Sequence, residues 1–81
     1  MTPTLEQRVI QVVTSQIAWQ PKPVDLSATW ESLRMDSLDA VEVEMDLEIE
    51  FDISIPDHMC GRINSIITAI VVIQELQEYA K

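Results

Sequence analysis

One serine has neighbours that could direct chemistry to it. Ser37 follows Asp36 directly and is followed by Asp39 two residues later. Because aspartate is a preferred N-cap residue, Asp36 predicts that a helix begins here and that Ser37 lies in its first turn with the hydroxyl pointing outward. A helix start presents unpaired N–H groups and a partial positive charge, which suit a phosphate-bearing group. Taken alone, the pattern does not distinguish a phosphate attachment site from an ordinary helix cap.

Catalysis by Ser37 itself lacks the partners that a nucleophilic serine needs. His58 is the only histidine and could act as a base, but no Gly-x-Ser-x-Gly elbow surrounds the serine. The acidic run from 46 to 57 does not form a calcium-binding loop, because Phe51 stands where that loop requires glycine. We therefore predict no enzyme activity and no dedicated metal site.

The composition narrows the possible partners and locations. The 81 residues carry a formal net charge of −9, which argues against nucleic acid or anionic membranes and favours basic protein surfaces. Cys60 is the only cysteine, so no intramolecular disulfide can form, as is common in cytoplasmic proteins. The most apolar run, 66–73, is too short to span a bilayer. We expect one soluble cytoplasmic domain over residues 1–81, a monomer without a membrane span.

The first part of the chain predicts one helix and a long connection. Helically spaced apolar residues indicate a helix from Leu5 to about Ile17, and Thr4 begins a capping-box pattern. Two prolines interrupt the segment 19–35, which we expect to be a loop held down by apolar anchors. The expected anchors are Trp19, Val24, Leu26, Trp30 and Leu33.

The segment 41–55 alternates apolar and polar residues, which by periodicity alone predicts a strand. Its many Glu, Met, Leu and Ala residues, and the cap at Asp36, favour a helix from Ser37 to about Phe51 instead. Such a helix has two apolar stripes, where a surface helix needs one. They are Ala40, Val43, Leu47 and Phe51 in the first and Leu38, Val41, Met45 and Ile49 in the second.

Two further helices are expected near the C-terminus. A short helical turn begins at Asp57 and is ended by Gly61, the only glycine. A last helix runs from Ile66 to about Tyr79, capped by the asparagine or serine just before it. Its apolar arc is wide, and we expect most of its members to be buried: Ile66, Ile67, Ile70, Val71 and Ile73.

The motif Asp-Ser-Leu-Asp-x-Val-Glu at 36–42, with the run 47–57 after it, resembles the centre of acyl carrier proteins of the dissociated fatty-acid-synthase type. The segment 63–66 resembles that family's start of the last helix. The resemblance covers nearly the whole chain, and it favours a helix over 37–51 instead of the strand that the periodicity predicts. It implies an all-α four-helix bundle, with three longer helices, one short helix and a long loop after the first.

The same resemblance implies a cofactor. In that family the central serine, here Ser37 between Asp36 and Leu38, carries a 4'-phosphopantetheine arm that derives from coenzyme A. The arm holds acyl intermediates as thioesters and presents them to partner enzymes in fatty-acid or related acyl-chain biosynthesis.

The resemblance also implies the partners, a phosphopantetheinyl transferase and acyl-chain enzymes with basic docking patches. Nine acids and no lysine or arginine lie from 36 to 57, and these like charges repel one another, so a docking face is the favoured interpretation over a merely solvated one. The residues at the family's docking positions are Asp36, Asp39, Val41, Glu42, Met45 and Glu48.

The chain departs from the family pattern at a few positions. Arg34 stands where the family usually has glycine, so the turn must either differ or carry strain of about 1 kcal/mol. Glu44 and Asp46 replace residues that are more often apolar or small, and Ile49 replaces a frequent acid. A specialised polyketide, aminoacyl or peptidyl carrier is therefore one alternative, and an unmodified acidic protein-interaction module is another.

Overall fold

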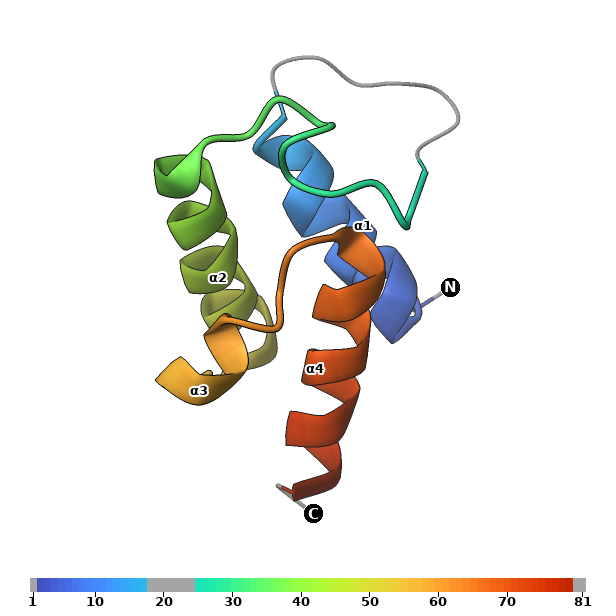
Figure 1. Cartoon of the computed structure of the whole chain (residues 1–81). Coiled ribbons are helices and arrows are strands. Elements are labelled where there is room, and N and C mark those ends of the chain that lie inside the picture. The colour runs from blue at the N-terminus through green and yellow to red at the C-terminus, as the bar shows by residue number, and fades with distance from the viewer. Residues whose placement is uncertain (1, 18–24, 80–81) are drawn as a thin grey trace.

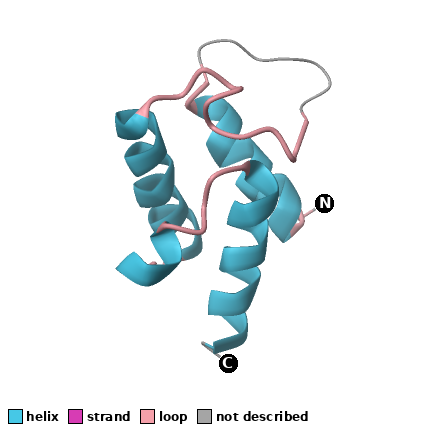
Figure 2. Cartoon of the chain, viewed as in Figure 1, coloured by secondary structure: helices cyan, strands magenta, loops and turns pink. Residues whose placement is uncertain are grey.

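The computed structural model describes residues 2–17 and 25–79, and every regular element within these ranges is a helix (Figures 1 and 2). Helix α1 spans Leu5–Ser15, α2 spans Ser37–Phe51, α3 spans Asp57–Cys60 and α4 spans Ile66–Tyr79. The predicted all-α bundle of three longer helices and one short helix is confirmed for this part of the chain. Among the described helices, none has the length and apolar character that a membrane crossing requires.

Helix α1 begins at the predicted capping box. The Thr4 side chain accepts a hydrogen bond from the Gln7 N–H at 3.2 Å, and the Gln7 side chain accepts one from the Thr4 N–H at 2.9 Å. The helix ends at Ser15, earlier than predicted, because the N–H of Gln16 bonds three residues back in a tighter turn. Ile17 is still buried, so the apolar pattern continues beyond the end of the helix.

The core lies between α1 and the two other long helices. Helix α1 contacts both α2 and α4 and lies behind them in the view of Figure 1. Val9 and Val13 of α1 face Val43 and Leu47 of α2 within one cluster, and all four are completely buried. Each fully buried side chain of this kind contributes roughly 1.5–3 kcal/mol relative to exposure. The buried faces of α1 and α2 therefore fix the orientation of both helices.

The second half of the long connection is tied to the start of α4. The Trp30 N–H donates to the Asn64 carbonyl at 2.9 Å, and the Ile67 N–H donates to the Leu26 carbonyl at 2.9 Å. Trp30 and Leu33 are buried and Leu26 is half-buried, so these three act as anchors as predicted. The other two expected anchors, Trp19 and Val24, lie outside the described residues.

The short helix α3 ends without the backbone freedom that glycine offers. Gly61 caps it with φ −64°, a right-handed conformation open to any residue. A Cβ on Gly61 would also meet nothing within 4 Å. The helix therefore stops here as predicted, but this glycine supplies neither a left-handed cap nor a close approach.

Helix α4 begins directly after Ser65, whose hydroxyl accepts a hydrogen bond from the Thr68 N–H at 3.2 Å. The predicted burial of its apolar arc is correct for Ile66, Ile70 and Ile73. It is wrong for two residues, since Ile67 is 47% exposed and Val71 is 41% exposed. These two are four residues apart and so share one face, which points away from the core.

Candidate functional site

The start of α2 is organised by two aspartates. Asp36 is the N-cap, and its side chain accepts a hydrogen bond from the Asp39 N–H at 2.9 Å, while the Asp39 carboxylate accepts one from the Asp36 N–H at 3.2 Å. The predicted cap at Asp36 is thus confirmed, and Asp39 completes a reciprocal capping box that the sequence analysis did not anticipate. An acid three residues after the cap was the available indication.

Ser37 is the first residue of α2, and its side chain is exposed. Because the Asp36 side chain caps the helix, the Ser37 hydroxyl is not needed as a cap, and it makes no hydrogen bond with any described residue. The N–H groups of Ser37 and Leu38 are likewise without a partner within the described part of the chain. An accessible hydroxyl beside two free N–H groups at a helix start fits a phosphodiester attachment.

The turn before this site is strained. Arg34 has φ 61°, in the left-handed region that costs a side-chain-bearing residue roughly 1–2 kcal/mol. The turn is closed by hydrogen bonds from the Arg34 N–H to the Glu31 carbonyl at 3.0 Å and from the Met35 N–H to the Trp30 carbonyl at 2.9 Å. Of the two outcomes that the sequence allowed, the chain therefore keeps the left-handed turn and carries the strain. Arg34 also places a positive charge three residues before Ser37.

The two apolar stripes of α2 divide between core and solvent. Val43, Leu47 and Phe51 are buried against α1, and the other stripe faces outward. Exposed large side chains on that outer stripe are Leu38, Val41, Met45 and Ile49. An apolar band of four residues on one helix face thus runs from Ser37 to the far end of α2.

The acids predicted for docking are not equally free. Asp36 and Glu42 are exposed, whereas Asp39 and Glu48 are half-buried and hold parts of the backbone. The Glu48 carboxylate accepts a hydrogen bond from the Ile55 N–H at 2.8 Å and so fixes the chain after α2. Among the described residues, no three His, Cys, Asp or Glu side chains are grouped as a metal ion would require.

A comparison with protein families identifies the kind of protein that has this arrangement. The model of a family described as "Phosphopantetheine attachment site" matches residues 7–70, from the first turn of α1 into α4. The chain belongs to the phosphopantetheine attachment site family. Its members attach 4'-phosphopantetheine covalently to a serine and act as carriers, not as enzymes. The resemblance to acyl carrier proteins is therefore confirmed at the level of the family.

The cysteine of this carrier, Cys60, is the last residue of α3 and is not suited to hold cargo itself. Burial raises the pKa of the Cys60 thiol, and the nearby carboxylate of Glu44 raises it further. The Sγ atom is 3.7 Å from the Ile55 carbonyl oxygen, to which the thiol can donate. Because the thiolate is the reactive form, a raised pKa makes Cys60 a poor nucleophile.

Glu44 of α2 shares this environment. Burial raises the pKa of the Glu44 carboxyl, the hydrogen bond with Cys60 opposes that shift, and the charges of Glu48 and Asp57 add to it. The single histidine, His58, is exposed on the adjoining helix α3.

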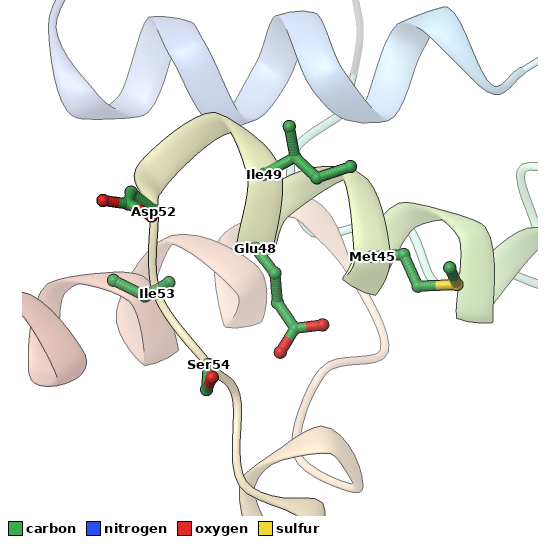
Figure 3. A pocket seen from close by; sticks show the side chains of 6 residues that line it. All are labelled: Met45, Glu48, Ile49, Asp52, Ile53 and Ser54. Atoms are coloured by element: carbon green, nitrogen blue, oxygen red, sulfur yellow. The ribbon is translucent and has the colours of Figure 1, made fainter.

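The far end of the carrier's α2 holds an open depression of about 520 Å³. Met45, Glu48 and Ile49 project from the helix, and Ile53 and Ser54 lie on the segment that leaves it (Figure 3). Asp52 completes the lining. It ends α2 in a left-handed conformation with φ 52°, which turns the following residues back beside the helix. Ile49 belongs to the second apolar stripe predicted from the sequence, but it was not among the predicted site residues.

Proposed function

We propose that Ser37 is the serine of this carrier that receives 4'-phosphopantetheine. The observation that supports it is the exposed, unbonded hydroxyl at the first residue of α2, left over because Asp36 caps the helix. Other serines suit the role less well, since the hydroxyls of Ser15 and Ser32 bond to nearby backbone carbonyls and Ser65 is buried. Among the serines in the described part of the chain, only Ser37 combines exposure with the start of a long helix.

We infer that the chain serves fatty-acid or related acyl-chain biosynthesis.

The loading reaction attaches the arm to Ser37. The Ser37 Oγ forms a bond to the phosphorus of coenzyme A that bears the pantetheine, and the pyrophosphate P–O bond breaks, so that adenosine bisphosphate leaves. A base of the transferase takes the hydroxyl proton. The free N–H groups of Ser37 and Leu38 would be available to hold a phosphate attached to Ser37, and the Asp36–Asp39 capping box keeps this helix start in place. When bound, the arm supplies a terminal thiol that holds an acyl group as a thioester.

The partners that we propose are the phosphopantetheinyl transferase and synthesis enzymes with basic docking patches. Asp36, Asp39 and Glu42 lie within two turns of Ser37, and Val41 and Met45 supply exposed apolar contacts between the acids. Charged groups of opposite sign accelerate such encounters and fix their orientation. With a net charge of −9, two copies repel each other, which supports a monomer. The single cysteine supports a cytoplasmic location.

A second candidate is a carrier dedicated to one polyketide, aminoacyl or peptidyl product. It is favoured by the exposed Ile49 at a docking position where related carriers often have an acid, and by the strained Arg34. A general fatty-acid ketosynthase can be offered the acyl form of this protein and the acyl form of a general fatty-acid carrier. If the ketosynthase elongates both equally well, a dedicated role is contradicted.

The experiment that tests the attachment is the intact mass of the protein before and after incubation with coenzyme A, Mg²⁺ and a broad-specificity phosphopantetheinyl transferase. We expect one added phosphopantetheine on the wild type and none on Ser37→Ala. Ser15→Ala, which removes an exposed serine on α1 away from the pocket at the end of α2, is the matched control and is expected to be modified as the wild type is. No addition to the wild type with several transferases would contradict the proposal and leave an unmodified interaction module.

A further inference from the structure

We propose that the depression at the end of α2 is a partner-selecting pocket, which receives one apolar side chain of an enzyme's docking surface next to an arginine or lysine. The pocket is lined by Met45, Glu48, Ile49, Asp52, Ile53 and Ser54. This inference rests on the proposed carrier function and deepens it. It assigns to Ile49 the role of a specificity-determining residue, distinct from the attachment at Ser37.

The apolar part of the pocket is unusually exposed. Ile49 is 78% exposed, more than any other large hydrophobic side chain among the described residues. Met45 on the preceding turn of α2 is 55% exposed, and Ile53, on the segment that leaves the helix, is half-buried (Figure 3). Covering these side chains would remove apolar surface from water at roughly 25 cal/mol per Å². An aliphatic or aromatic side chain is the natural occupant of such a pocket.

The rim of the pocket is acidic and partly fixed. Asp52 is exposed at one side, whereas Glu50, two residues before it, lies outside the lining and pairs with Arg8 of α1 at 2.8 Å. The Glu48 carboxylate is held by the Ile55 N–H at 2.8 Å, so this wall is already ordered before a partner arrives. No lysine or arginine lines the pocket, so the Asp52 carboxylate is available to a partner's cation. The occupant we infer is therefore an apolar side chain flanked by a basic one.

The pocket also gives a partner a fixed position relative to Ser37. Leu38, Val41, Met45 and Ile49 lie on one face of α2, so the apolar band connects the attachment residue to the pocket. Ser37 and Ile49 are twelve residues apart, or about 18 Å along the helix axis. A partner helix laid along this band, with one apolar anchor in the pocket, would hold Ser37 at the opposite end of the contact.

An acid at position 49 would select a different partner. A carboxylate there would attract a basic side chain and would be costly to bury under an apolar one, whereas Ile49 favours contact with an apolar side chain. Ile49→Glu is thus expected to change the preferred contact at this position from an apolar side chain to a basic one. The matched control is Ile67→Glu, which makes the same change at a 47% exposed isoleucine on α4, outside the pocket.

The test uses the full-length protein and two synthetic amphipathic helical peptides that share their arginines and lysines and differ at one central residue, leucine or arginine. Affinities are measured by titration calorimetry, and binding is mapped from the NMR shifts of the isoleucine methyl groups. We expect the leucine peptide to bind the wild type about tenfold more tightly than Ile49→Glu, since a buried isoleucine contact contributes at least 1.4 kcal/mol. The arginine peptide is expected to show the opposite order, and Ile67→Glu to behave as the wild type.

Two further results keep the test decisive. Ile49→Ala removes the apolar side chain without adding charge, so it is expected to weaken the leucine peptide alone. The proposed pocket would be overturned if the wild type and all variants bound the two peptides in the same order of affinity. It would also be overturned if the methyl groups of Ile49 and Ile53 showed no NMR shift on binding. If the wild type accepts phosphopantetheine but shows no peptide selectivity, only the pocket fails. If it shows selectivity but is never modified, the carrier assignment of this chain's Ser37 fails, and with it the class of partner.

Discussion

Helices α1 and α2 start in the same way and differ in what they expose. Each begins at a capping box, formed by Thr4 and Gln7 in one and by Asp36 and Asp39 in the other. Each also buries an apolar stripe in the shared core. The residue after the cap is Leu5 in α1, which packs against the core, and an exposed serine in α2.

The outer faces of the two helices carry the functional difference. None of the large apolar residues of α1 is among the strongly exposed ones, whereas α2 exposes four of them between acidic side chains. The comparison indicates that the capped, core-facing half of each helix is scaffold. A site arises where the same scaffold leaves a hydroxyl and an apolar band in solvent.

The largest effect should separate the two faces of α2. Leu47→Ala removes a completely buried side chain and should lower the free energy of unfolding by about 2–5 kcal/mol. Ile49→Ala changes a mostly exposed one and should shift it by less than about 0.5 kcal/mol. Urea unfolding followed by circular dichroism measures both. Similar losses for the two variants would contradict the assignment of inner and outer faces.

The two caps should be equal in stability and unequal in function. Thr4→Ala and Asp36→Ala each remove one N-cap acceptor and should each cost about 1 kcal/mol of stability. Only Asp36→Ala should also slow transferase modification of Ser37, because it loosens the start of α2. Modification rates by mass spectrometry provide the comparison, and equal slowing by Thr4→Ala would show that only global stability matters.

The turns leading into the two helices should also respond differently. Thr4 precedes α1 with an ordinary φ of −72°, while Arg34 precedes α2 in the left-handed region. Arg34→Gly relieves that strain and should stabilise the fold by up to about 1 kcal/mol, less the entropy that glycine adds to the unfolded chain. A rise in the urea midpoint is the expected observation. A clear loss would show that contacts of the Arg34 side chain outweigh the strain.

A charge reversal on the outer face of α2 should weaken docking without affecting the fold. Glu42 is exposed, so Glu42→Lys should leave the unfolding midpoint nearly unchanged. It should reduce the transferase kcat/KM several-fold, mostly at low salt, because a complementary charge is replaced by a like one. An unchanged kcat/KM at low salt would argue against acidic docking near Ser37.

The smallest effect concerns the pH dependence at the α2–α3 contact. Burial raises the pKa of Glu44, so the folded state binds a proton more tightly than the unfolded state and its stability falls as the pH rises through that pKa. Glu44→Gln should therefore stabilise the protein slightly at neutral pH, and the gain should disappear as the pH is lowered through the raised pKa. Urea midpoints across that range test this. A gain that persists in acid would point to packing instead of charge.

Much of the fold was predictable because its local patterns agree with its packing. The capping box at Thr4, the cap at Asp36 and the two apolar stripes of α2 were all visible as residue types and spacing, although spacing did not tell which stripe is buried. The alternation over 41–55 predicted a strand, and only composition and the family resemblance favoured the helix that forms. Spacing of this kind does not tell how far a wide apolar arc is covered, so the burial of Ile67 and Val71 was predicted wrongly.

By itself the sequence determined the helices, the cap that leaves the Ser37 hydroxyl unused, and the family. These depend on short-range chemistry, namely capping, helical spacing and a compact motif. Only the tertiary structure decided that Arg34 keeps its left-handed turn, that Glu48 is bound by the Ile55 N–H, and that Ile49 faces solvent in a pocket. Each of these depends on where the chain returns after a helix ends, and no local pattern specifies that return.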